Sequence, residues 1–128
     1  MTYLLDSDIL IYYFKKKAPF FGIVEGILNN ATVVISAIIT TEVRAGWDDD
    51  QTEKWLPVMK DLFPVIAVSF AIAEHAGYHM KRLSQRGRTV TTTDGIIAAT
   101  AIINGYCLVT NNIEDFPMPE LQLYTMTT

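Results

Sequence analysis

Short apolar runs alternate along this 128-residue chain with longer stretches in which hydrophobic residues recur every three or four positions. The short runs are rich in β-branched residues and predict strands, whereas the periodic stretches predict amphipathic helices. The predicted strands are residues 2–5, 32–36, 64–68, 106–110 and 121–125. This order of elements favours an α/β sandwich with a mostly parallel central sheet of about five strands, formed by a single domain over residues 1–128.

Capping residues and helix breakers bound the predicted helices. The start signals are Asp8, Pro19, the acids at 48–50, Ser69 and Asp94. Glycines 46, 87 and 105 mark three of the helix ends. The resulting helices span residues 8–14, 19–30, 37–46, 48–63, 70–86 and 94–104. We expect Pro57 to interrupt the fourth of them.

Charge and cysteine content narrow the class of protein. Fourteen acidic residues against ten basic ones give a net charge of −4, which argues against a protein that coats nucleic acid non-specifically. The single cysteine, Cys107, excludes an internal disulfide, and the apolar stretches are too short to span a membrane. Asp6 and Asp8 stand where a secretory signal carries positive charge, so we expect a cytoplasmic protein with no membrane partner.

Half of the residues are hydrophobic, which indicates a surface covered by a partner. The apolar side chains concerned lie on the second predicted helix and at two tryptophans beyond it: Phe20, Ile23, Val24, Ile27, Trp47 and Trp55. We expect some of them to remain exposed in the monomer and to support self-association.

Four acids occupy comparable places relative to the predicted strands. Asp6 follows the first strand, and Glu42 lies on the helix after the second. Asp94 begins a helix, and Asp115 comes shortly after the fourth strand. Because ligands bind beyond the carboxyl ends of parallel strands, we expect the four carboxylates to share one edge of the sheet. Mg²⁺ neutralises such clusters and binds substrate phosphates, so the set predicts metal-dependent phosphoryl chemistry.

Each acid also has a purely structural interpretation. Asp8 and Asp94 can serve as helix N-caps, and Asp115 can belong to a turn. Glu42 can be a solvated helix residue beside Arg44. Their joint placement at one edge favours the functional interpretation.

Two other kinds of site share parts of this pattern. The opening LLDSDIL also resembles haloacid-dehalogenase-type phosphatases and response-regulator receivers, but both need a late lysine and none follows Lys81. His75 and His79 lie one helical turn apart, as in a zinc-binding helix, but the glutamate of an H-E-x-x-H site is absent. We interpret the histidine pair as part of a half-exposed helix face.

Four segments resemble the PIN-domain family, and most of all the VapC-type toxins of prokaryotic toxin–antitoxin modules. They are LLDSDILI with Asp6, ISAIITTEVRAG with Glu42, TTTDGIIAATAIINGYCLVTNN with Asp94, and NIEDFPMPELQLY with Asp115. The resemblance covers nearly the whole chain and implies a PIN-like three-layer sandwich. It also implies a homodimeric endoribonuclease that uses Mg²⁺ or Mn²⁺, with a VapB-type antitoxin over the active groove. By position, Asp6, Glu42 and Asp94 match the family's core metal ligands, and Asp115 matches its less uniform fourth acid.

The residues around these acids both match and depart from the family. Asn112 matches a polar residue that often accompanies the fourth acid. Asp8 stands where Asn or Ser is common, and Asn111 where a basic residue is common. The resemblance implies an ion held by Asp6, Asp94 and Asp115 that activates water, with a second ion near Glu42 as an open alternative.

A basic segment precedes Asp94 and is a candidate RNA-binding surface. Its charged residues are Lys81, Arg82, Arg86 and Arg88. They suit contacts with RNA phosphates, and the alternative is a solvated helix end favoured by the helix dipole. A PIN-like module that binds a partner without cleaving RNA also stays open as an alternative function.

Overall fold

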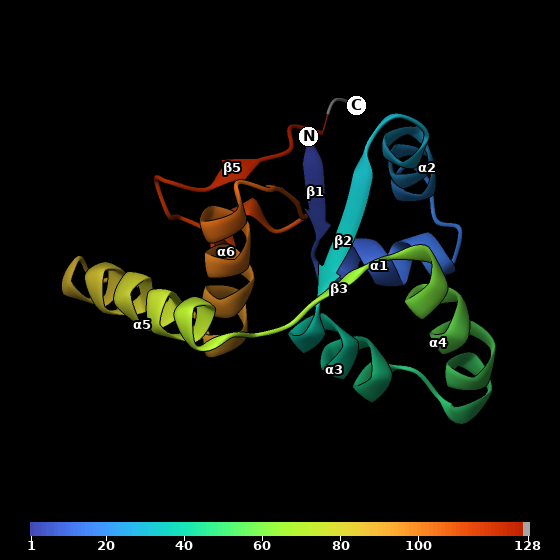
Figure 1. Ribbon diagram of the computed structural model, residues 1–128, viewed down its shortest axis with the longest axis horizontal. Helices are drawn as coiled ribbons and strands as arrows, with labels where there is room; N and C mark the ends of the chain where they lie inside the picture. Colours follow the sequence, from blue (N-terminus) through green and yellow to red (C-terminus); the bar gives the residue numbers. More distant parts are fainter. Residues whose placement is uncertain (127–128) are drawn as a thin grey trace.

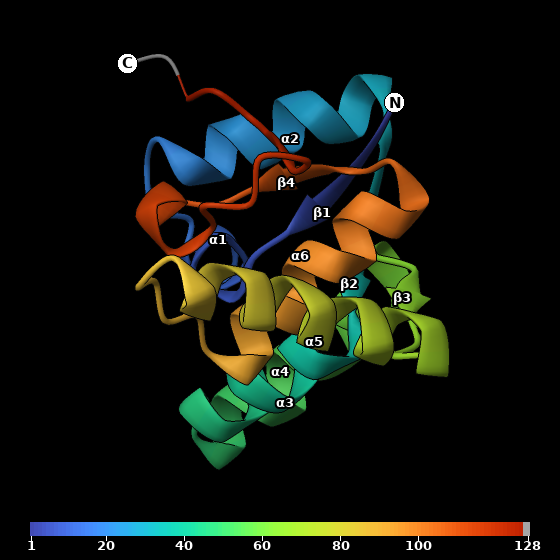
Figure 2. The same cartoon turned by 90° about the vertical axis from the view of Figure 1, so that its left-hand side faces the viewer.

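The computed structural model describes residues 1–126, in which a parallel sheet lies between two layers of helices (Figures 1 and 2). Its strands are β1 (Thr2–Leu5), β2 (Thr32–Ser36), β3 (Val65–Ile66), β4 (Cys107–Val109) and β5 (Gln122–Leu123). The strand order is β3-β2-β1-β4-β5, and each neighbouring pair is parallel. The predicted α/β sandwich with a central sheet of five strands is therefore confirmed.

The inner strands agree best with the prediction, and the edge strands are shorter. β1 and β2 have the predicted bounds, whereas β3 and β5 contain two residues each instead of five. An edge strand has a neighbour on one side only, and Val65 in β3 is 46% exposed. With less burial and fewer hydrogen-bond partners, the ends of these apolar runs leave the sheet.

Six α-helices cover the sheet within residues 1–126. They are α1 (Ser7–Phe14), α2 (Phe20–Asn30), α3 (Ala37–Gly46), α4 (Asp49–Leu62), α5 (Phe70–Gln85) and α6 (Thr92–Asn104). Figure 1 shows α5 and α6 on one side of β1 and β2, with α1, α2 and α4 on the other. None of these helices combines the length and the apolar character needed to cross a membrane.

Two predicted helix starts are wrong, and both errors concern acids of interest. Helix α1 is capped by Asp6, which places Asp8 inside the first turn. Helix α6 is capped by Thr91, which likewise places Asp94 inside the first turn. In each case a polar residue further upstream accepts a hydrogen bond from the free backbone N–H groups. The interpretation of Asp8 and Asp94 as N-caps is therefore wrong.

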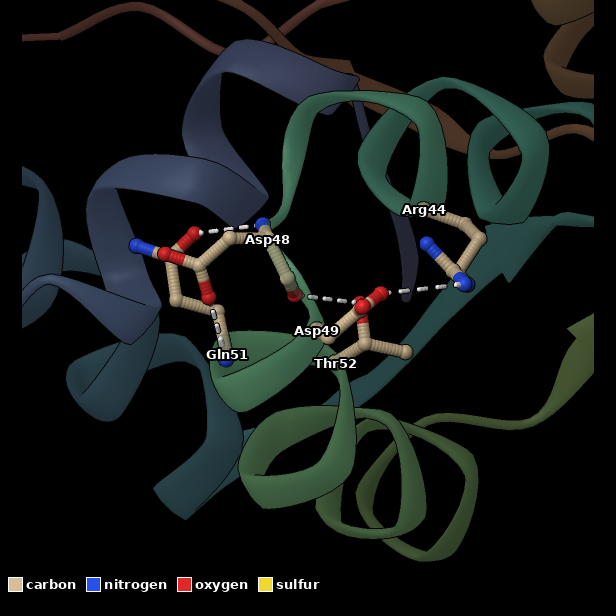
Figure 3. Close-up of polar contacts among 5 residues, drawn as sticks. All are labelled: Arg44, Asp48, Asp49, Gln51 and Thr52. Atoms are coloured by element: carbon tan, nitrogen blue, oxygen red, sulfur yellow. Dashed lines mark hydrogen bonds and ion pairs between the residues drawn. The ribbon is translucent and has the colours of Figure 1, made fainter.

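Helix α4 shows how the acids at 48–50 act where they are only structural (Figure 3). The Asp48 carboxylate accepts from the backbone N–H of Gln51 at 2.8 Å, and the Gln51 side chain accepts from the Asp48 N–H at 3.0 Å. The helix continues through Pro57, so the predicted interruption is wrong. Proline deprives the carbonyl four residues earlier of its partner, but that residue, Glu53, is exposed and water can replace the lost bond.

The core explains why the inner strands are apolar throughout. Leu4 pairs with Val34 on one side and Leu108 on the other, and all three side chains are buried. Strands covered by helices on both faces bury both sets of side chains, so they lack alternation.

The expected exposed apolar face on α2 is not found. Val24, Ile27 and Trp47 are buried. The other residues of that set, Phe20, Ile23 and Trp55, are half-buried against the same core. The exposed large apolar residues lie elsewhere, with Phe70 at 88% exposure and Ile113 at 56%.

Candidate active site

Asp6 is the most buried acid of the predicted set. It directly follows β1, and its backbone N–H donates to the carbonyl of Val109 in β4 at 2.9 Å. Its Oδ1 accepts from the Ser7 N–H and its Oδ2 from the Thr110 hydroxyl, both at 2.8 Å. Only 5% of the residue is exposed. The side chain is therefore fixed at the carboxyl ends of two adjacent strands.

Asp8 joins α1 to the loop after β4. One carboxylate oxygen accepts from the Ile9 N–H at 2.7 Å. The other accepts from the backbone N–H of Asn111 and from the side-chain amide of Asn112, both at 3.0 Å. Three donors occupy this carboxylate, so its geometry suits a clamp between two segments better than a metal ligand.

The other three acids reach the same region from separate elements. Glu42 lies on α3, which follows β2, and its side chain is exposed. Asp94 lies in the first turn of α6, where its N–H donates to the Thr91 hydroxyl at 3.1 Å. Asp115 ends a short 3-10 helix, η1 (Ile113–Asp115), beyond β4. Arg44 lies near Asp49 at 3.9 Å, so the structure gives it a partner other than Glu42.

Electrostatic coupling shows that these carboxylates are neighbours. Burial raises the pKa of Asp6 to about 7, and the charges of Asp8 and Asp94 add to this increase. Desolvation by nearby protein atoms is also the main cause of a raised pKa at Asp8 and Asp94, and at Glu42 although that residue is exposed. Asp115 adds repulsion at Asp8 and Asp94, and Asp94 adds it at Glu42. Such mutual repulsion is what a bound cation would remove.

The donor chemistry of this site fits a hard divalent cation. Carboxylate oxygens are the ligands that Mg²⁺ and Mn²⁺ prefer. Within residues 1–126, no three His, Cys, Asp or Glu side chains are already arranged to hold an ion. Glu42 and Asp115 are exposed, so rotation about their side-chain bonds is the simplest way to close a ligand set around Asp6 and Asp94.

Only part of the predicted basic segment borders the acids. Arg88 lines a hollow of about 270 Å³ together with Asp94 and Asp115. Its guanidinium donates to the backbone carbonyl of Glu114 at 3.3 Å, which holds it next to η1. Arg82 and Arg86 line a different cavity, and Lys81 is exposed on α5. The structure therefore brings Arg88 to the acids and not the other three basic residues.

Sequence reasoning missed Thr110, which positions Asp6. The Thr110 hydroxyl donates to Asp6 and accepts from the Asn112 N–H at 3.0 Å. Thr110 is only 2% exposed. A threonine directly after the apolar β4 run, at the carboxyl end of the strand next to β1, was the available signal.

Comparison with known proteins identifies the family. The PIN domain family profile matches residues 3–117. The chain is 29% identical over 121 residues to Ribonuclease VapC2 of Rickettsia felis, covering 91% of this chain and 90% of that protein. It is 31% identical over 113 residues to Ribonuclease VapC1 of Methanocaldococcus jannaschii, covering 88% and 77%.

A solved structure supports the same assignment. VapBC2 from Rickettsia felis, bound to a DNA fragment from its promoter, superposes with a TM-score of 0.87 at 28% identity. The match covers 99% of this chain and 100% of the other. The chain therefore belongs to the PIN domain family and resembles its VapC-type members.

Proposed function

We propose that this chain is a metal-dependent endoribonuclease and the toxin of a type II toxin–antitoxin module. One observation carries the nuclease proposal: carboxylates from four separate elements lie close enough at the carboxyl edge of the sheet that their charges add to the desolvation that raises the pKa of Asp6, Asp8, Glu42 and Asp94. A cluster that only stabilised the fold would avoid such repulsion. The ribonuclease names of the relatives support RNA as the substrate.

Asp6, Glu42, Asp94 and Asp115 are the residues that would hold Mg²⁺ or Mn²⁺. A bound divalent cation supplies Lewis-acid activation of water and neutralises charge on the phosphodiester. Asp6 gives the set a fixed point, because both of its oxygens have hydrogen-bond donors. Asp8 and Asn112 keep the segment before η1 against α1, and so limit how far Asp115 can move.

Arg88 is the best-placed residue to bind an RNA phosphate beside the acids. It lines the hollow that contains Asp94 and Asp115, and its guanidinium is anchored by the Glu114 carbonyl. A positive charge at this place offsets the repulsion between the carboxylates and the incoming backbone. The exposed residues Lys81, Arg82 and Arg86 would contact more distant phosphates.

The proposed partner is a VapB-type antitoxin, and the proposed assembly is a homodimer of the toxin. The neighbouring structure from Rickettsia felis is a VapBC complex, which supports a partner of that class. Exposed apolar residues such as Phe70 and Ile113 offer surface that a partner can bury. A phosphatase of the haloacid-dehalogenase type is disfavoured, because no lysine follows Lys81 in the sequence.

The test is cleavage of labelled RNA with Mg²⁺ or Mn²⁺, with and without EDTA. We expect EDTA to stop cleavage and Asp94→Asn to lower the rate by about a thousand-fold or more, because the acids act as a unit. Asp61→Asn, which removes an exposed charge on α4, is the matched control and should retain full activity. Cleavage that survives both EDTA and Asp94→Asn would overturn the nuclease proposal.

The toxin proposal needs a separate test in cells. Expression of the chain should slow growth, whereas expression of the Asp94→Asn variant should not. Co-expression of a small protein encoded next to the chain should restore growth, and that protein should co-purify with the chain. Equal growth with wild type and Asp94→Asn would overturn the toxin proposal and leave the nuclease proposal intact.

A further inference from the structure

The two histidines of the chain form a contact on α5 that the proposed nuclease site does not use. Residues four apart on a helix lie on one face, and Nε2 of His75 is 3.0 Å from Nε2 of His79. The rings are nearly perpendicular, at 82°, with their centroids 4.5 Å apart. His79 is only 4% exposed, so the interpretation of a half-exposed helix face is wrong for this residue.

A carboxylate from another part of the chain lies beside the His79 ring. Oε2 of Glu120 lies 3.5 Å from Nδ1 of His79. Glu120 precedes β5, and Figure 2 shows the red segment before β5 above α5. A carboxylate at this position favours the proton on Nδ1, so Nε2 of His79 is the acceptor in its contact with Nε2 of His75. Burial lowers the pKa of His79, followed by the effect of His75, so the ring is neutral near pH 7.

We propose that His75 and His79 bind a first-row transition cation such as Zn²⁺ through their Nε2 atoms, with the Glu120 carboxylate beside the outer nitrogen of His79. Neutral imidazole with a carboxylate behind it is a recurrent metal-binding arrangement, because the carboxylate fixes the tautomer and makes the ligand more basic. In residues 1–126 no group of three ligand side chains is present, so water would complete the coordination.

The distance between the two nitrogens fits one shared ion. A tetrahedral zinc ion with Zn–N bonds of about 2.0–2.1 Å places two ligand nitrogens about 3.3 Å apart. The half-buried His75 ring can supply that small increase by a change of side-chain torsion. When the ion binds, the Nε2 proton of His75 moves to Nδ1 of the same ring. The neutral ring therefore binds the ion with no net loss of a proton.

Ligand type separates this site from the acid cluster. Imidazole nitrogens favour zinc, copper and nickel, whereas carboxylates favour magnesium and manganese. Two positive side chains, Arg82 and Arg86, line the hollow beside His79. Arg82 donates to the Tyr78 hydroxyl at 3.0 Å and lies over that ring. The negative charge of Glu120 offsets the repulsion that Arg82 would exert on a bound cation.

The test is a Zn²⁺ titration of the full chain in excess Mg²⁺, followed by NMR of ¹³C-labelled histidine. Because the chain has only two histidines, each imidazole signal is assigned by one variant. We expect both imidazoles to shift with a single affinity. His75→Ala, which alters the less buried ring, should lower that affinity at least about ten-fold, and Glu120→Gln about ten-fold.

Two controls separate this site from general effects of charge. Glu53→Gln removes one exposed carboxylate from α4 and should leave zinc affinity unchanged. Asp94→Asn should also leave it unchanged, because it alters only the acid cluster. Imidazole signals that do not respond to Zn²⁺, or equal affinity in His75→Ala, would overturn the proposal and identify the pair as a hydrogen bond within α5. A loss of zinc binding in Asp94→Asn would overturn it as well.

Discussion

The two ends of helix α1 have opposite energetic characters. At its N-terminal end, Asp6 and Asp8 are partly desolvated and repel each other, and burial raises the pKa of both. At its C-terminal end, the Tyr13 ring stacks on Phe21 and packs edge-to-face with Phe63. The ring centroids are 5.2 Å and 5.9 Å apart, respectively. Helix α1 is only eight residues long, so electrostatic repulsion and dense aromatic packing lie at the two ends of one short element.

This contrast explains how a short helix can hold acids close together. Phe14 extends the packed end, because its ring centroid lies 5.5 Å from that of Trp47 and 5.8 Å from that of Trp55. Aromatic burial of this kind contributes several kcal/mol, which offsets the electrostatic cost at the other end. The aromatic end therefore keeps the acids positioned without needing any attraction among them.

The largest expected effect on stability comes from removing the aromatic packing. Phe63 is fully buried, and Phe63→Ala should lower the free energy of unfolding by about 3–5 kcal/mol. Urea denaturation of the metal-free protein measures the change. Phe70→Ala is the matched control, because Phe70 is 88% exposed and its loss should cost less than about 0.5 kcal/mol. Equal costs for the two variants would mean that aromatic packing at the C-terminal end of α1 stabilises the fold no more than an exposed side chain does.

The next effect tests the strained end through pH. The pKa of Asp6 is about 7 in the folded state and 3.8 without its environment, so the folded state binds the proton more tightly. The contribution of the Asp6 carboxyl group to folding stability is therefore complete below about pH 4, where the group is protonated in both states, and is lost as pH rises through about 7. In EDTA, Asp6→Asn should be more stable than wild type at pH 7.5 by at most about 4 kcal/mol, and the two should converge at low pH.

Asp61→Asn is the control for this pH experiment, because it removes a carboxylate that is exposed. Its difference from wild type should not vary in the same way between pH 4 and 7. If Asp6→Asn is less stable than wild type throughout this range, hydrogen bonds to the carboxylate outweigh its burial, and the N-terminal end of α1 is not strained.

The sequence predicted the type and order of the helices and strands better than the residues at which they begin and end. Apolar runs located all five strands, and the inner ones stand out most clearly because burial on both faces dictates their composition. The runs did not locate the ends of β3, where tertiary pairing decides which residues are hydrogen-bonded. The helix starts at Ser7 and Thr92 were missed because Asp6 and Thr91 serve as caps.

The site followed from the sequence only in outline. The strand-edge argument predicted one shared edge for Asp6, Glu42, Asp94 and Asp115, because parallel strands end on one side of the sheet. In the structure the charge of Asp94 acts on Asp6 and Glu42, and that of Asp115 acts on Asp94. The clamp between Asp8 and Asn111 joins positions 103 apart, so no local pattern encodes it. The His79 contact with Glu120 also joins two separate segments, α5 and the segment before β5, so no local pattern encodes it either.

The Asp8 clamp gives a smaller effect, expected in activity rather than stability. Asp8→Ala removes the acceptor of the Asn111 N–H, so the loop that leads to Asp115 becomes less restrained. We expect RNA cleavage to fall about ten- to a hundred-fold and exchange of the Asn111 amide proton to accelerate. Asp49→Ala is the control, since Asp49 is also an acid in the first turn of a helix but is fully exposed. Unchanged exchange at Asn111 would contradict the clamp.

The smallest effect concerns a polar contact inside the aromatic end. The Tyr13 hydroxyl donates to Oε2 of Glu25 at 3.0 Å, and burial together with Glu25 raises the pKa of Tyr13 to about 12. Because Glu25 is exposed, Tyr13→Phe should cost only about 1 kcal/mol of unfolding free energy, and Glu25→Gln less. In the double variant the two costs should be less than additive, since the first change already removes the shared bond. Tyr12→Phe is the control, because that ring stacks on Phe20 at the helix surface. Strict additivity would mean that the packed end of α1 depends on apolar contact alone, which would make its contrast with the acidic end sharper still.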